Sequence, residues 1–127
     1  MPLGPLKERT MKFALRVIHL VKSLPKSDVA SVVGRQLLRC ATSVGANYRA
    51  ASCGRSLADF CSKMGIVHEE IDESLYWMEL IVESKLVKHE RLRLLMQEAE
   101  EIRAMTIASL RTARRKRQKK ENPANEN

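Results

Sequence analysis

The sequence predicts an all-α protein, built as an antiparallel, up-down-up-down four-helix bundle. Apolar residues recur three and four positions apart along most of the chain, and no segment alternates like a strand. The 127 residues include only five aromatic side chains, which is few for a sheet protein. Four periodic segments with short connections place successive helices side by side in opposite directions.

The first helix is expected over residues 5–24, and Pro25 ends it because proline disfavours helical geometry in the residue before it. Two stripes follow this segment at spacings of three and four. The apolar stripe, expected to face the core, consists of Phe13, Val17, Leu20 and Leu24. The basic stripe consists of Arg9, Lys12, Arg16 and His19.

The second helix is expected over residues 28–51, with Ser27 or Asp28 as its N-cap. Its middle, residues 43–47, carries small and amide residues that usually mark turns. The apolar stripe nevertheless passes through this segment without losing phase, so we predict one continuous helix. The stripe consists of Val29, Val33, Leu37, Cys40 or Ala41, Val44 and Tyr48.

The third and fourth helices are expected over residues 57–84 and 91–114, so that the bundle spans residues 5–114. Ser56 and Asp59 have the spacing of a capping box before the third helix. A core stripe runs from Leu57 to Val82, and another from Leu92 to Leu110. Residues 115–127 have no regular apolar stripe and are predicted to be a disordered basic tail.

Charge is segregated along the chain, whose net charge is +8. Residues 1–55 carry +8, residues 56–110 carry −5 and residues 111–127 carry +5. This asymmetry favours nucleic acid, another anionic partner, or charge pairing between subunits.

Neither catalysis nor a cofactor is indicated by the sequence. The three histidines fall in no nucleophile or metal motif, and the three cysteines form no CxxC pair. His68 and Asp72, one helical turn apart, leave a metal-dependent enzyme as a weaker alternative, because the Glu-x-x-His pairs of di-iron bundles are absent. An odd number of cysteines, no signal-like segment and no long apolar run lead us to expect a cytoplasmic protein with no membrane partner.

Basic residues are the candidate nucleic-acid ligands. Arginine suits bidentate phosphate contacts, and a basic surface binds the phosphate backbone without reading sequence. The candidates are Arg9, Lys12, Arg16, Arg35, Arg39, Arg49, Arg114, Arg115, Lys116 and Arg117. For Arg35, Arg39 and Arg49 an equal alternative is pairing with acids of the third helix, within or between subunits. For the tail the alternative is a solvated charge run.

The small-residue centre of the second helix, with Ser43, Gly45 and Asn47, is a candidate subunit interface. Small side chains let helix backbones approach closely, and a buried amide requires hydrogen-bond partners. Ordinary packing within the chain is the alternative.

Two segments, QLLRCATSVGANYRAA and SLADFCSKMGIVHEEIDESLYWMELI, resemble the ribosomal-RNA intervening-sequence family. That family also includes the accessory variability determinants of diversity-generating retroelements. The matching positions are Gln36, Leu37, Arg39, Ser43, Gly45, Asn47, Asp59, Phe60, Lys63, Glu70, Glu73, Tyr76, Trp77 and Glu79. The resemblance covers roughly residues 6–112. Ala50-Ala51, where an acid is common, and Cys40, where serine is common, depart from the pattern.

The resemblance implies an antiparallel four-helix bundle that assembles as a ring-like homopentamer with a basic surface. For the retroelement members it also implies binding to a reverse transcriptase and to nucleic acid. We therefore expect a non-catalytic, oligomeric protein that binds RNA or DNA without sequence specificity. The alternative is a protein-interaction scaffold whose segregated charge serves homo-oligomer assembly.

Overall fold

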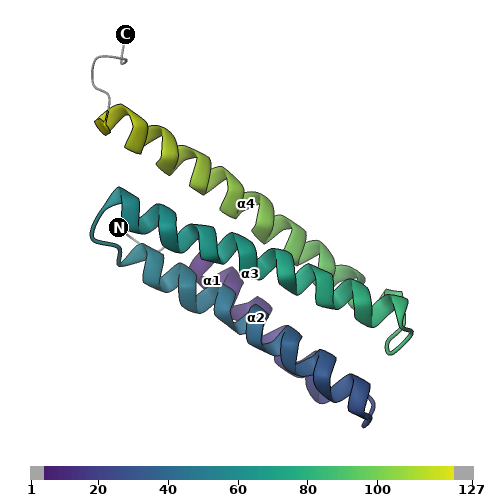
Figure 1. The fold of residues 1–127 in the computed structure, drawn as a ribbon. Coiled ribbons are helices and arrows are strands. Elements are labelled where there is room, and N and C mark those ends of the chain that lie inside the picture. Colours follow the sequence, from purple (N-terminus) through teal and green to yellow (C-terminus); the bar gives the residue numbers. More distant parts are fainter. Residues whose placement is uncertain (1–4, 122–127) are drawn as a thin grey trace.

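The computed structural model describes residues 5–121, which form four α-helices and no strand (Figure 1). The helices are α1 (Pro5–Lys22), α2 (Asp28–Ser52), α3 (Leu57–Glu83) and α4 (His89–Glu121). Serine caps begin two of them: the hydroxyl of Ser27 accepts from the Ala30 N–H, and that of Ser56 accepts from the Asp59 N–H. None of the described helices is both long enough and apolar enough to cross a membrane.

Each helix packs against two others: α2 lies between α1 and α3, and α4 contacts α3 and α1. Close contacts fix the α1–α2 pair. Thr10, early in α1, lies against Gly45, late in α2, whereas Leu24, just after α1, lies against Gly34, early in α2. Such contacts are made by neighbouring helices that run in opposite directions.

The predicted stripes form the core with one correction. Phe13, Val17 and Leu37 are completely buried, and so is every position of the α3 stripe from Met64 to Met78 except Leu75, which is 4% exposed. The prediction for Val29 is wrong, because its side chain is 59% exposed and Ala30 is buried instead. The stripe of α2 therefore begins at Ala30, whose spacing of three from Val33 is also helical.

The prediction of one continuous α2 is confirmed, since the helix runs from Asp28 to Ser52 through the small-residue segment. Gly45 allows the close approach of α1. A Cβ atom on Gly45 would lie 3.2 Å from Thr10 Oγ1 and 3.4 Å from Thr10 Cβ. The hydroxyl of Thr10 donates to the Leu6 carbonyl at 2.6 Å, so this buried polar group is satisfied within α1.

The expected disorder after residue 114 is wrong for residues 115–121, because α4 continues to Glu121. Arginine, lysine and glutamine favour the helix even where no apolar stripe is present. An i, i+4 ion pair between Arg117 Nε and Glu121 Oε1 at 3.0 Å adds to this preference. The remainder of the predicted tail, residues 122–127, lies outside the described residues.

Candidate nucleic-acid interface

Arg9 is held by acids of α4. Its Nε donates to Glu98 Oε2 at 3.0 Å, and its guanidinium lies 3.6 Å from Glu101. The hydrogen bond to Glu98 raises the pKa of Arg9, and the same bond lowers the pKa of Glu98. Arg9 therefore has its charge compensated inside the bundle.

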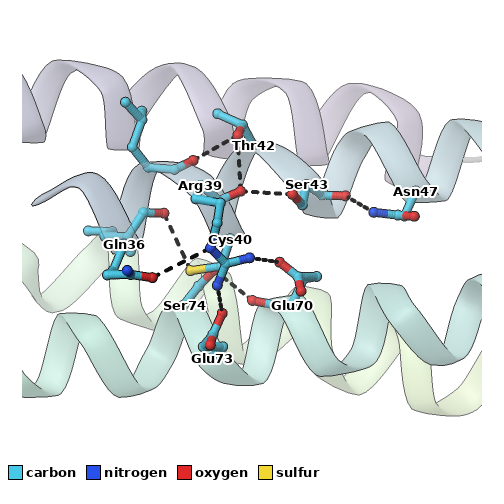
Figure 2. Close-up of polar contacts among 11 residues, drawn as sticks. Gln36, Arg39, Cys40, Thr42, Ser43, Asn47, Glu70, Glu73 and Ser74 are labelled. Carbon is cyan, nitrogen blue, oxygen red and sulfur yellow. Dashed lines mark hydrogen bonds and ion pairs between the residues drawn. The ribbon is translucent and has the colours of Figure 1, made fainter. Parts of the chain in front are cut away.

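Arg39 is likewise paired within the chain, with acids of α3. Figure 2 shows its guanidinium between Glu70, whose carboxylate lies 3.2 Å away, and Glu73. The hydrogen bond to Glu73 raises the pKa of Arg39. Beneath this pair, the buried Ser74 hydroxyl lies 3.3 Å from Cys40 Sγ, and burial raises the pKa of the Cys40 thiol. Arg39 therefore pairs with acids of α3 in its own chain, which is one of the alternatives that the sequence leaves open.

The other predicted cations of α1 and α2 are exposed. Lys12 pairs with Glu8 at 3.0 Å across one turn of α1. Arg35 donates to the Ser31 hydroxyl at 3.3 Å, and no carboxylate within residues 5–121 pairs with Arg35, Arg16 or Arg49. Exposed pairs such as Lys12–Glu8 contribute little stability, so all four of these side chains can reach an anion.

The α4 end, which we define as residues 114–121, holds the densest group of cations. Every residue of this segment is exposed. Arg117 pairs with Glu121, whereas Arg114, Arg115, Lys116, Lys119 and Lys120 pair with no carboxylate among the described residues. Lys116 lines a shallow cavity of about 320 Å³ with Leu57 and Phe60, which places the α4 end beside the α2–α3 connection.

Arg55, in the α2–α3 connection, borders the same region. It lines a second small cavity that shares Leu57 and Phe60 with the first. Figure 1 shows the start of α1, the α2–α3 connection and the α4 end at the same end of the bundle. The nearby carboxylate of Asp59 is already bonded to Lys63 Nζ at 3.2 Å and to the Arg55 N–H at 3.3 Å, and the Lys63 bond lowers its pKa. This end of the molecule therefore keeps an excess of exposed positive charge.

The three residues predicted for a subunit interface make contacts within the chain. The Ser43 hydroxyl donates to the Arg39 carbonyl at 2.8 Å, and Asn47 Nδ2 donates to the Ser43 carbonyl at 2.9 Å (Figure 2). Gly45 packs on Thr10. Thus, Gly45 allows α1 to pack closely on α2, whereas Ser43 and Asn47 bond to the backbone of α2 itself; contact of these residues with a second subunit stays a prediction.

An apolar groove between α1 and α2 was not predicted from the sequence. It has a volume of about 430 Å³, and Met11, Leu15 and Ile18 of α1 line it together with Ala46 and Arg49 of α2. Met11 and Leu15 are 49% and 56% exposed. The sequence does contain the signal, since residues 11, 15 and 18 have helical spacing on a side of α1 other than the core stripe.

The part of the chain that the structure describes contains no cluster of side chains that could bind a metal ion. No group of three or more histidine, cysteine or acidic side chains is placed to hold an ion there. Cys40, Cys53 and Cys61 are free thiols.

Comparisons with known proteins place this all-helical bundle in a family. Residues 6–108 match the model of the 23S rRNA-intervening sequence protein family. A crystal structure of a protein of unknown function from the S23 ribosomal protein family of Bacteroides thetaiotaomicron is similar, with 32% sequence identity and a TM-score of 0.78. The similarity covers 83% of this chain and 97% of that one. No curated protein matches.

The chain thus belongs to the class of four-helix proteins with no strand among the described residues. More specifically, it is a member of the 23S rRNA-intervening sequence protein family. The match ends at residue 108, whereas α4 continues to Glu121, so the α4 end lies beyond the region that the family model covers.

Proposed function

We propose that this protein is a non-catalytic, oligomeric bundle that binds the phosphate backbone of RNA or DNA without sequence specificity. The observation that carries the proposal is the group of exposed cations at the α4 end that have no carboxylate partner among residues 5–121. Such side chains release counterions when they meet phosphates, and this release gives affinity that does not depend on base sequence.

The proposed interface differs from the basic surface that the sequence alone suggests. Arg9 and Arg39 are left out because each is already bonded to two carboxylates. Arg114, Arg115, Lys116 and Arg117 remain, with Arg55 beside them. Arg16, Arg35, Arg49 and Lys12 extend the surface along α1 and α2.

Binding to labelled single- and double-stranded RNA and DNA tests this proposal when it is measured by fluorescence anisotropy over a range of salt concentrations. We expect binding to all four that weakens steeply with salt and differs little between base sequences. No binding at low salt, or affinity independent of salt, would overturn the proposal.

Self-association forms the second part of the proposal. We infer that the antiparallel bundles assemble as a homopentameric ring, as the family resemblance implies. The exposed Met11 and Leu15 support a subunit contact, because large apolar side chains gathered along a groove mark interaction sites. We expect Leu15→Asp to reduce the mass measured by light scattering. Leu94→Asp is the matched control, since Leu94 is 58% exposed on α4. Equal masses for the two variants would contradict this contact.

The alternative function is an interaction scaffold in which the positive α1–α2 side meets the acidic α3 of a neighbouring subunit. Segregated charge favours this alternative. However, Glu70 and Glu73 already pair with Arg39 of their own chain and are therefore less available to a neighbouring subunit. The variant Arg35→Glu/Arg39→Glu discriminates between the two. A collapse of oligomer size with nucleic-acid binding retained would favour the scaffold.

A reverse transcriptase is the protein partner that we propose by analogy with the retroelement accessory proteins, in the cytoplasm. The free thiols are consistent with a reducing compartment. A reverse-transcriptase gene with a template repeat beside the gene for this chain would support that partner, whereas a ribosomal-RNA operon would argue against it.

A further inference from the structure

The α4 end is an exposed helix, and near its start Lys116 lines the shallow cavity with Leu57 and Phe60 of α3. Ala113 is the last buried residue of α4, and the eight residues of the α4 end are all exposed. Figure 1 shows this part of α4 at the edge of the molecule. At a rise of 1.5 Å per residue, the segment extends α4 by about 12 Å.

Positive charge surrounds this helix instead of following one side. Arg114, Arg115, Lys116 and Arg117 are consecutive, and successive residues of an α-helix point about 100° apart. The four side chains therefore project in four directions. Lys119 and Lys120 add two further cations in the next turn.

This distribution suits a ligand that presents anions on both sides of the helix. A single phosphate row needs cations along one side only, as in a one-sided basic stripe. The α4 end also has no apolar residue, so it lacks the apolar side with which helices bind bilayer surfaces or hydrophobic grooves. A groove bordered by two phosphate rows supplies the required geometry.

The two kinds of duplex differ in whether they offer such a groove. The major groove of B-form DNA is about 12 Å wide and admits an α-helix. The major groove of A-form RNA is deep and too narrow for side chains to read. A helix about 10–12 Å across with its side chains therefore fits the first and not the second.

From these observations we infer that the α4 end enters the major groove of duplex DNA and contacts phosphates of both strands. The inference rests on the proposed function and deepens it, because it names duplex DNA as the preferred ligand. It concerns residues beyond the part of the chain that the family model matches.

Three duplexes of one sequence test the inference with the full chain: DNA, RNA, and DNA whose major groove is filled by glucosylated 5-hydroxymethylcytosine. All three carry the same phosphate charge. We expect the unmodified DNA to bind at least about tenfold more tightly than the other two. Equal, salt-dependent affinities would overturn the inference and leave the proposed function intact. Binding to none of the three would overturn both.

A variant that changes shape without changing charge provides the second test. Gln118→Pro breaks the helix of the α4 end, because proline removes a backbone N–H and clashes with the preceding turn. Gln118 lies beyond the last buried residue, so the bundle should fold unchanged. Gln118→Ala is the matched control. We expect Gln118→Pro to lose most of the preference for DNA over RNA and Gln118→Ala to keep it. The same preference in both variants would overturn the inference.

Discussion

The side of the bundle and the α4 end carry the same kinds of cationic side chain in different electrostatic surroundings. On the side, Arg9 and Arg39 each lie between two carboxylates of a neighbouring helix. At the α4 end, Arg114, Arg115 and Lys116 meet no carboxylate among the described residues. The number of basic residues in a segment therefore does not measure how much positive charge is available to a ligand, because nearby carboxylates neutralise some of these residues and not others.

Removal of the α4 end should have the largest effect on nucleic-acid affinity and little effect on stability. A chain that ends at Ala113 loses only exposed residues among those described. We expect its free energy of unfolding in urea to stay close to that of the full chain, and its affinity for nucleic acid to fall by about tenfold or more. Phe13→Ala serves as the opposite reference. Phe13 is completely buried, so this change should cost about 3–5 kcal/mol of stability. Wild-type affinity in the shortened chain would contradict the account.

Glu98→Gln tests the paired cations on the side of the bundle. This substitution removes the main carboxylate partner of the half-buried Arg9. We expect the free energy of unfolding to fall by about 1 kcal/mol at neutral pH, because hydrogen bonds to charged groups stabilise more than neutral ones. Urea denaturation of both proteins measures the difference.

The difference in the free energy of unfolding between the wild type and Glu98→Gln should depend on pH. Arg9 lowers the pKa of Glu98 in the folded chain, so the stabilisation is complete above the pKa of the unfolded state. It is lost as the pH falls through the lower, folded pKa. The gap between wild type and Glu98→Gln should therefore close in acid, and a gap that stays constant would show that the ion pair is not its cause.

Replacing Gly65 or Gly45 by alanine should have the smallest effect on stability. The two substitutions together distinguish the contribution of helix propensity from that of packing. Around Gly65, a new Cβ would meet nothing within 4 Å, so Gly65→Ala should raise stability by about 0.5–1 kcal/mol. Gly45→Ala should gain less, because the new Cβ would lie 3.2 Å from Thr10 Oγ1. Thermal denaturation compares the two, and equal gains would mean that the α1–α2 contact at Gly45 is not tight.

Periodic features of the molecule were predictable from the sequence. The stripes of α1 to α4 follow from helical spacing, and the phase of α2 through residues 43–47 correctly indicated one helix. Val29 stands four positions before Val33, a helical spacing that predicts burial, but it is 59% exposed, so spacing alone does not locate the end of the stripe.

Pairing between distant residues was not predictable in the same way. Arg9 and Glu98 are 89 positions apart, and Arg39 and Glu70 are 31 apart, so only the packing of the helices brings them together. The helix at the α4 end was missed for a different reason. Its residues favour a helix by intrinsic propensity but show no apolar period, so the apolar pattern does not indicate a helix there.

The salt dependence of DNA binding tests the central claim most directly. Two variants remove the same number of positive charges: Arg114→Gln/Arg115→Gln/Lys116→Gln at the α4 end, and Arg9→Gln/Arg39→Gln/Arg103→Gln among cations that each pair with two carboxylates. For the first, we predict that the slope of log affinity against log salt becomes shallower by about 2–3, since each lost phosphate contact changes it by about 0.9. For the second, we predict a slope close to that of the wild type. Equal changes in both variants, or a larger change in the second, would contradict the claim that the α4 end supplies the phosphate contacts.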